Sequence, residues 1–271
     1  MTTVMPADSA EERNHAELDA GLLVGVTDRG LRHQQNEDAI ALQVAEGPDG
    51  AVPLAVVSDG VSSAPRPDEA SLVAVRTGVG VLAAAVREGH ELAQASVAAA
   101  QAAAQALRQL AGADGAPAAT YVSVAAAGDL VTICWLGDSR VYWLSPDPAE
   151  CERLTRDDSL AEELVTAGLA TPEEAMASPQ AHVITRWLGA DLPEVEPQLR
   201  QFRPPGPGVL AVCSDGLWNY RPEAADLAAL VTFPAVLTAP LDAAVSLVRF
   251  AVDAGGMDNI TVALIPFAAP R

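Results

Sequence analysis

The sequence predicts an α+β protein in which antiparallel sheets and helices form separate layers. Three observations favour this class: strand-length apolar runs rich in β-branched residues recur, neighbouring runs are joined by very short connections, and strands and helices come in blocks. Such short connections make antiparallel hairpins, because a parallel pair needs a crossover of roughly a dozen residues. The pattern therefore argues against a doubly wound parallel sheet. Since the 271 residues contain no evident repeat or linker, we expect one domain.

The first part of the chain combines short strands with two long helices. Apolar runs bounded by Gly, Asp or Pro are the expected strands, at 21–30, 38–47, 52–60, 120–129, 130–139 and 140–146. Two alanine-rich segments, 68–89 and 90–112, carry larger apolar residues at helical spacing. Because alanine favours helix and has a small side chain, we expect both segments to be helices that lie close on a sheet.

The second part of the chain is richer in helix. A polar, helix-rich stretch covers 155–190, and a strand follows at 208–216. Helices are expected within 222–231 and 241–256, and a final strand covers 259–267.

Residues 1–20 carry acidic rather than basic charge and lack the apolar core of a secretory signal. We interpret them as a flexible N-terminal tail that precedes a domain at 21–267. No stretch approaches the roughly 20 consecutive apolar residues of a membrane span.

Charge and cysteine content narrow the classes of partner. The 36 acidic and 16 basic residues give a net charge of −20, which repels nucleic acid and anionic membrane surfaces. Such an excess is commonly a solvated surface. The three cysteines, Cys134, Cys151 and Cys213, show no CxxC spacing, so neither a disulfide framework nor a zinc knuckle is indicated. We expect a monomer in a reducing cytoplasm, with no nucleic-acid or membrane partner.

Acidic residues stand at the ends of several expected strands. Two apolar runs end in the same three residues, Ser, Asp and Gly, at 58–60 and 214–216. The whole acidic set consists of Glu37, Asp38, Asp59, Asp138, Asp215 and Asp258. Converging carboxylates repel one another unless a cation neutralises them, so the set indicates an all-oxygen metal site. Oxygen ligands favour Mg²⁺ or Mn²⁺ over zinc, and the surplus of carboxylates suggests two ions. The Gly60 carbonyl can also approach a metal.

Six short motifs occur in a characteristic order. They are NEDA at 36–39, SDGVSS at 58–63, LGDSRVY at 136–142, LTRDDS at 154–159, SDGLWN at 214–219 and DNIT at 258–261. In this order and spacing the chain resembles the metal-dependent protein phosphatases of type 2C, which include bacterial Ser/Thr phosphatases. The likeness covers about 21–267. It implies a four-layer α/β/β/α sandwich of two antiparallel sheets flanked by helix pairs, with a mobile flap at about 156–186.

The resemblance also implies a role for each acidic position. Asp59 would bridge two metal ions, Asp215 and Asp258 would complete the shell of one ion, and the Gly60 carbonyl would bind the other. Two further acidic residues would act largely through metal-bound waters, namely Glu37 and Asp38. In bacterial members the Asp of the GDSR motif contributes to a third metal site, and here that residue is Asp138.

The implied activity is that of a protein serine/threonine phosphatase. A water activated by Mn²⁺ or Mg²⁺ would hydrolyse the phosphomonoester without a covalent enzyme intermediate. The implied partners are phosphorylated proteins, among them Ser/Thr kinases and their substrates. The alternative is a pseudophosphatase that binds phosphoproteins without turnover, which the loss of Asp59, Asp215 or Asp258 would have favoured. All three are present.

The chain departs from the family at the phosphate-binding position. The family usually has an arginine four residues before the Glu of the NED motif, and here that position is His33, with Arg32 one residue earlier. On an extended chain a shift of one residue turns a side chain to the opposite face. We expect His33 to face the phosphate. The alternatives are that Arg32 binds it, or that His33 is an ordinary loop residue and water replaces the arginine.

Overall fold

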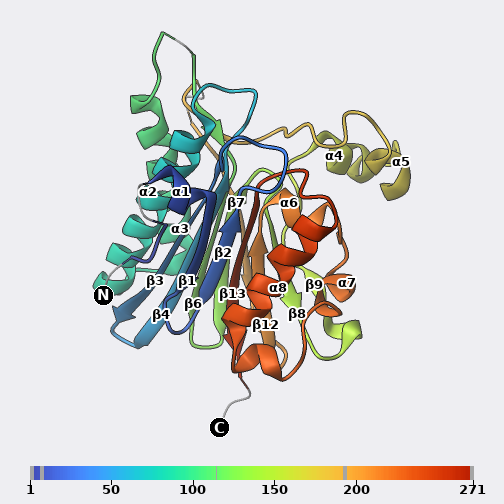
Figure 1. Ribbon diagram of the computed structural model, residues 1–271. Helices are drawn as coiled ribbons and strands as arrows, with labels where there is room; N and C mark the ends of the chain where they lie inside the picture. Colours follow the sequence, from blue (N-terminus) through green and yellow to red (C-terminus); the bar gives the residue numbers. More distant parts are fainter. Residues whose placement is uncertain (1–2, 7–8, 114, 192–193, 269–271) are drawn as a thin grey trace.

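Two antiparallel sheets stack face to face between layers of helices in the computed structural model, which describes residues 3–6, 9–113, 115–191 and 194–268 (Figure 1). The pairings between the described strands are all antiparallel. The α+β class is therefore confirmed, and the arrangement agrees with a four-layer α/β/β/α sandwich.

The first sheet has six strands in the order β1-β2-β13-β12-β8-β9. Their bounds are β1 His15–Asp19, β2 Val24–Asp28, β13 Ile260–Phe267, β12 Gly208–Cys213, β8 Arg140–Leu144 and β9 Glu152–Arg153. The second sheet has five strands in the order β11-β7-β6-β4-β3. Their bounds are β11 Gln198–Phe202, β7 Leu130–Leu136, β6 Tyr121–Ala127, β4 Gly50–Asp59 and β3 Asp38–Gly47. A small third sheet pairs β10 Leu188–Gly189 with β5 Ala118–Ala119.

Helices cover the outer faces of both sheets. The α-helices are α1 Ala10–Asn14, α2 Pro67–Glu88, α3 Leu92–Gln109, α4 Leu160–Thr166, α5 Pro172–Met176, α6 Asp215–Trp218, α7 Ala224–Ala228 and α8 Pro240–Asp253. Two 3₁₀ turns, η1 Pro148–Glu150 and η2 Ala235–Leu237, complete the elements. The helix pair α2 and α3 packs on the five-stranded sheet, whereas α7 and α8 pack on the six-stranded sheet.

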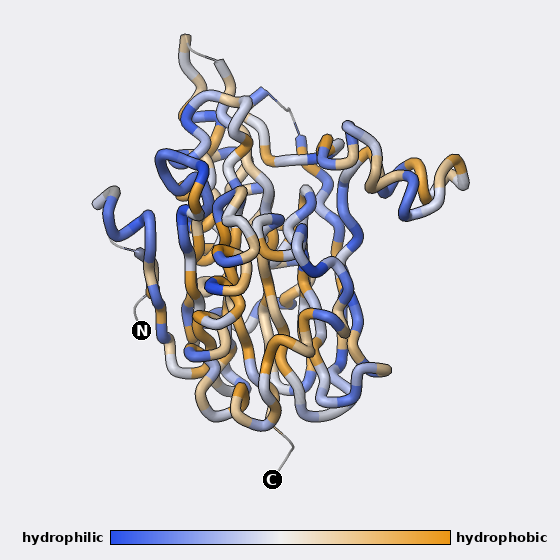
Figure 2. The backbone as a smooth tube through the Cα atoms, turned by 45° about the vertical axis from the view of Figure 1, so that its right-hand side comes forward, coloured by the Kyte–Doolittle hydropathy of each residue, from blue (hydrophilic) through white to orange (hydrophobic). Residues whose placement is uncertain are grey.

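Alternation along β3 shows why this strand is buried on both faces. Ile40 and Leu42 enter the core between the two sheets, whereas Ala39 and Ala41 face the α2 and α3 helices. Successive side chains of a strand point to opposite faces, so a strand between two layers is apolar throughout. Figure 2 shows the same pattern, with the apolar segments concentrated in the strands and along the packed helices.

Small residues let α2 approach the sheet closely, as the alanine content predicted. A Cβ at Gly78 of α2 would lie 2.5 Å from the hydroxyl oxygen of Tyr121 on β6. Among the described residues, α2 is long and apolar enough to cross a membrane by length and composition alone. However, 56% of its most apolar window is buried inside the protein. Here α2 is a core helix.

The prediction of a flexible N-terminal tail is wrong for the described part of residues 1–20. Residues 10–14 form α1, and residues 15–19 form β1, which pairs with β2 at the edge of the six-stranded sheet. Val4 makes an isolated bridge to Leu42. The prediction missed these elements because the segment is short and rich in polar residues, so its apolar pattern is weak.

The segment 156–186 projects from the sandwich and carries α4 and α5 (Figure 1). Ala161, Ala175 and Ala181 form a small apolar cluster of their own. An isolated bridge between Ser159 and Ile184 closes its base. The identification of this segment as a mobile flap stays a prediction.

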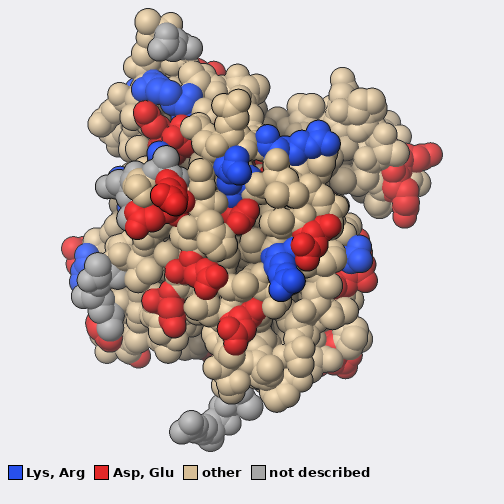
Figure 3. Space-filling view, in the orientation of Figure 1, with Lys and Arg blue, Asp and Glu red and all other residues tan. Residues whose placement is uncertain are grey.

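The acidic side chains on the face shown in Figure 3 are dispersed over the sandwich rather than gathered in one patch. This distribution fits the interpretation of most of the negative charge as a solvated surface.

Candidate active site

The acidic residues that the sequence singled out come from both sheets and meet at one end of the sandwich. Asp38 begins β3 and Asp59 ends β4, and these two residues are directly paired across the ladder. Asp215 opens α6 directly after β12, Asp258 precedes β13, and Asp138 lies between β7 and β8. We call these five residues the acidic centre.

The charges of the acidic centre act on one another. Loss of surrounding water, and then the charges of Asp38, Asp215, Asp138 and Asp258, raise the pKa of Asp59 well above its ordinary value. Desolvation likewise raises the pKa of Asp215, followed by the charges of Asp138, Asp258 and Asp38. Five carboxyl groups thus lie within electrostatic range of one another.

The two most buried members show the same effect. Burial raises the pKa of Asp38 to about 7, against the opposing effect of the hydrogen bond from Ser214. Burial and then the charge of Asp157 raise the pKa of Asp138 to about 7, while Arg140 opposes the increase. Near neutral pH, protons and cations would therefore compete for these carboxyl groups.

Unpartnered oxygens test whether the acidic centre suits a metal ion. Asp38 Oδ1 and Asp215 Oδ1 are buried and have no hydrogen-bond partner. A buried oxygen without a hydrogen-bond partner lowers the stability of the folded state unless a ligand binds it. Within the described residues, no three Asp, Glu, His or Cys side chains form a ready-made group around one point. The donor set is nevertheless all oxygen and mutually repulsive, which suits a hard divalent cation.

Close backbone packing explains the glycine of each Ser-Asp-Gly sequence. A Cβ at Gly60 would lie 2.3 Å from the carbonyl oxygen of Pro67, at the start of α2. A Cβ at Gly216 would lie 1.9 Å from the carbonyl oxygen of Asn259. In both places another backbone passes where a side chain would stand, so only glycine fits. The glycines let neighbouring segments pack tightly beside Asp59 and Asp215.

Glu37 lies at the edge of the acidic centre. Its carboxylate accepts a hydrogen bond of 2.5 Å from Ser62 Oγ, and its amide N–H donates to Asn259 Oδ1 at 2.7 Å. The main chain of Glu37 accepts a hydrogen bond from Gly60 N at 3.1 Å. Glu37 is thus held against the loop that follows Asp59.

His33, rather than Arg32, faces the acidic centre. His33 Nε2 lies 3.1 Å from Asp258 Oδ1, and the His33 side chain is 26% exposed. Arg32 is exposed at the surface. The side chain of Arg29 supports the loop by donating to the His33 carbonyl oxygen at 2.7 Å.

A model of a known protein family matches the part of the chain that contains most of these residues. The family model described as "Protein phosphatase 2C" matches residues 29–247. The chain belongs to the protein phosphatase 2C family. That match includes every member of the acidic centre except Asp258, which lies beyond its end.

Relatives and solved structures of the 2C family resemble the chain. Protein phosphatase PhpP of Streptococcus pneumoniae is 40% identical over 130 residues, which is 48% of this chain and 50% of PhpP. The alignment thus spans about half the length of this curated relative. The structure of the S. agalactiae serine/threonine phosphatase is 31% identical with a TM-score of 0.74, over 89% of this chain and 97% of that one. The catalytic domain of serine/threonine protein phosphatase PstP, solved in complex with two manganese ions, is 26% identical with a TM-score of 0.66, over 97% and 98% of the chains.

Sequence reasoning missed the polar residues that hold the acidic centre of this 2C family member. Ser214 Oγ donates to Asp38 Oδ2 at 2.6 Å, and Thr120 Oγ1 accepts from the amide of Asp59 at 2.9 Å. Asn259 binds the Glu37 amide. Asn259 and Ser214 belong to the quoted motifs, so their position in those motifs was the available signal.

Arg140 and Trp218 have structural contacts beside Asp138. Arg140 Nε and Nη2 donate to the Asp157 carboxylate at 2.9 and 2.6 Å, and its guanidinium lies 3.5 Å from the centre of the Trp218 ring. Trp218 Nε1 donates to the carbonyl oxygen of Asp138 at 2.9 Å. Both side chains are buried, and these contacts give them a structural role.

Proposed function

We propose that the protein is a metal-dependent protein serine/threonine phosphatase that hydrolyses phosphomonoesters with an activated water and without a covalent intermediate. The observation that carries the proposal is the pair Asp59 and Asp215, which stand at the ends of strands in different sheets and lie close enough for the charge of Asp215 to raise the pKa of Asp59. Membership of the 2C family and the names of its relatives, PhpP and PstP among them, support the same activity.

We assign a separate role in metal or water binding to each acidic residue of the site. Asp59, Asp215 and Asp258, with the Gly60 carbonyl, would hold Mn²⁺ or Mg²⁺. Bound divalent cations supply a water of lowered pKa as nucleophile and neutralise phosphate charge. Glu37 and Asp38 would orient water molecules, and Asp138 would serve a third ion. The two manganese ions in the PstP catalytic domain support a count of at least two.

A cysteine nucleophile does not fit the structure. Cys213 directly precedes Ser214 and is fully buried, and burial raises the pKa of its thiol. Burial likewise raises the pKa of Cys134 to about 12. A thiol of raised pKa is protonated at neutral pH and is a poor nucleophile. Water is therefore the nucleophile that the surroundings of the acidic centre favour.

His33 would bind the phosphate of the substrate. Its ring reaches the edge of the acidic centre at Asp258, whereas Arg32 is exposed. A protonated imidazole can donate one hydrogen bond to a phosphate oxygen. This binds phosphate more weakly than the two parallel hydrogen bonds of an arginine.

The proposed substrates are phosphoserine and phosphothreonine in proteins, including Ser/Thr kinases and the targets of those kinases. We further propose that the chain acts as a monomer in the cytoplasm. The three free cysteines, two of them buried, support a reducing compartment.

Hydrolysis of an aryl phosphate by the purified chain, with Mn²⁺, with Mg²⁺ or with excess chelator, tests the activity. Phosphoserine, phosphothreonine and phosphotyrosine peptides then test the substrate class. We expect turnover with either cation, none with chelator, and a loss of several orders of magnitude in Asp215→Asn. Equal turnover in wild type with and without chelator would disprove the metal-dependent mechanism.

A further inference from the structure

The N-terminal segment, defined as residues 9–19, contacts the loop that leads into the acidic centre. It consists of Ser9, α1 and β1, and β1 extends the six-stranded sheet by one edge strand. The match to the 2C family begins at residue 29, so the N-terminal segment lies outside it. The family model therefore does not describe this segment.

Two consecutive residues of the N-terminal segment bind the loop between β2 and β3. The main-chain oxygen of Asn14 accepts from the amide of Arg29 at 2.8 Å, and Asn14 Oδ1 accepts from the amide of Asn36 at 3.0 Å. The main-chain oxygen of Arg13 accepts from Asn36 Nδ2 at 2.9 Å. The loop is thus held at both its beginning and its end.

Asn36 connects the N-terminal segment to Asp38 through hydrogen bonds. Asn36 is 4% exposed, and its Nδ2 donates a second hydrogen bond, to Thr27 Oγ1 at 2.8 Å. Its Oδ1 accepts from the amide of Asp38 at 3.2 Å. All the polar atoms of this buried side chain are therefore used, and they fix the position at which β3 and its first carboxylate begin.

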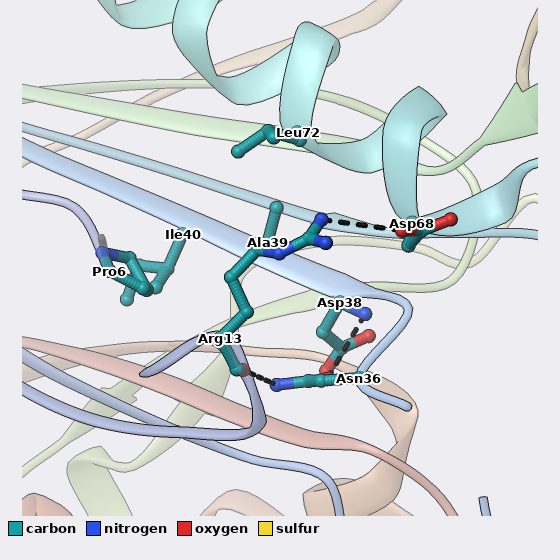
Figure 4. A pocket seen from close by; sticks show the side chains of 8 residues that line it. All are labelled: Pro6, Arg13, Asn36, Asp38, Ala39, Ile40, Asp68 and Leu72. Atoms are coloured by element: carbon teal, nitrogen blue, oxygen red, sulfur yellow. Dashed lines mark hydrogen bonds and ion pairs between the residues drawn. The ribbon is translucent and has the colours of Figure 1, made fainter. Parts of the chain in front are cut away.

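The side chain of Arg13 reaches the first turn of α2, the helix that follows the β3–β4 hairpin. Arg13 Nη1 lies 3.3 Å from Asp68 Oδ2, in the first turn of α2 (Figure 4). The preceding residue, Pro67, has its carbonyl oxygen packed against Gly60, the residue after Asp59. Figure 4 shows Arg13 joined to Asp68 through its guanidinium and to Asn36 through its main-chain oxygen, beside a cavity of about 10 Å³ that Asp38 also lines. Arg13 therefore connects the supports of the two paired aspartates.

We propose that Arg13 and Asn14 are positioning residues that set the distance between Asp38 and Asp59 for cation binding. The identity of the cation rests on the proposed function, but the metal-binding test below needs no turnover. A carboxylate centre binds an ion well when surrounding hydrogen bonds fix its ligands in advance. Loss of the Asn14 acceptor leaves the buried amide of Asn36 without a partner and frees the loop to shift.

Metal binding and fold stability can be separated by one pair of measurements. For Asn14→Ala we would titrate Mn²⁺ and record the concentration that raises Tm above its value in chelator by the same fixed amount as in wild type, and would also record Tm in chelator. We expect this Mn²⁺ concentration to be about five- to tenfold higher than in wild type. That factor corresponds to the free energy of one buried hydrogen bond. Tm in chelator should fall by no more than about 3 °C. Excess Mn²⁺ should restore kcat for an aryl phosphate.

Two variants serve as matched comparisons. Asn14→Asp keeps an oxygen acceptor at the same place and should return the Mn²⁺ requirement close to that of wild type. Glu11→Gln alters an exposed residue of the same helix and should leave the requirement unchanged. Asp68→Asn weakens the far end of the Arg13 contact and should raise the requirement, which keeps the proposal testable if Asn14→Ala does not fold.

A purely structural role predicts a different result. In that case Asn14→Ala and Asp68→Asn would lower Tm in chelator but need the same Mn²⁺ concentration as Glu11→Gln, and the proposal would be overturned. If wild type binds Mn²⁺ and these variants bind it more weakly, but no phosphomonoester is hydrolysed, the proposed function fails while the positioning role stands.

Discussion

Ser214 Oγ donates a hydrogen bond of 2.6 Å to Asp38 Oδ2 and accepts one of 3.0 Å from the amide of Thr261. Ser214 follows β12 of the six-stranded sheet, whereas Asp38 begins β3 of the five-stranded sheet. One buried hydroxyl therefore joins the two sheets at the acidic centre.

Ser214→Ala should destabilise the protein by about 1–3 kcal/mol, because it leaves a buried amide and a buried carboxylate oxygen without a partner. Urea unfolding in chelator measures this change in the free energy of unfolding. Ser246→Ala removes an exposed hydroxyl that bonds its own helix, and it serves as the control. Equal stability of the two variants would show that the Ser214 bond contributes little.

The metal-free protein should lose stability as pH rises. Because burial raises the pKa of Asp38 and Asp138 to about 7, these groups keep their protons in the folded state up to neutral pH. In the unfolded chain an aspartate releases its proton near a pKa of about 3.9. Between about pH 4 and 7 the folded state thus binds more protons, and its stability falls with increasing pH.

Thermal unfolding in chelator from about pH 5 to 8 measures this dependence. Tm should decrease across the range in wild type, and the decrease should be smaller in Asp138→Asn. The exposed Asp49→Asn variant should follow wild type. A Tm that rises steadily with pH in chelator would contradict the assigned direction.

Asp59→Asn should have opposite effects on stability with and without metal. In chelator near pH 8 the variant should be more stable than wild type, because it removes one charge from a group of repelling carboxylates. With Mn²⁺ at a hundred times its dissociation constant, wild type should gain about 2.7 kcal/mol and the variant far less. Differential scanning calorimetry measures both, with Asp49→Asn as the control. The same gain from Mn²⁺ in both proteins would place the ions elsewhere.

His33 variants should change KM rather than the metal requirement. His33→Arg should lower KM for a phosphomonoester and reduce its dependence on pH, because arginine is always charged and can donate two parallel hydrogen bonds. His33→Ala should raise KM. Steady-state kinetics between about pH 6 and 9 measure these effects. If Arg32→Ala raises KM and His33→Ala does not, then Arg32 binds the phosphate.

Elements with a strong apolar pattern could be predicted from the sequence, because burial on one or both faces imposes that pattern. The β3–β4 and β6–β7 hairpins and the alanine-rich α2 and α3 are examples. Strands at a sheet edge escaped prediction. In β11, the five residues Gln198–Phe202 include three polar ones and none that is fully buried, so the segment resembles a loop. The same reason hid β1.

The acidic residues could be predicted because a charged residue at the end of an apolar strand is visible in a sequence. The polar residues that hydrogen-bond to them could not be predicted. The contact between Glu37 and Asn259 joins positions 222 residues apart, and an amide carries no charge that marks it as a partner. Asn14 is likewise an ordinary polar residue until the fold places it against Asn36. Such pairs form only in the tertiary structure, so no local sequence pattern predicts them.

The position of the acidic centre across two separately hydrogen-bonded sheets has a consequence for local opening. Asp59 belongs to the five-stranded sheet, and Asp215 follows a strand of the six-stranded sheet. A cation held by both side chains would cross-link the two halves of the sandwich without any covalent bond. Amide hydrogen exchange should then slow together at the adjoining ends of β4 and β12, although these strands share no ladder, because neither sheet could separate from the other without first releasing the ion.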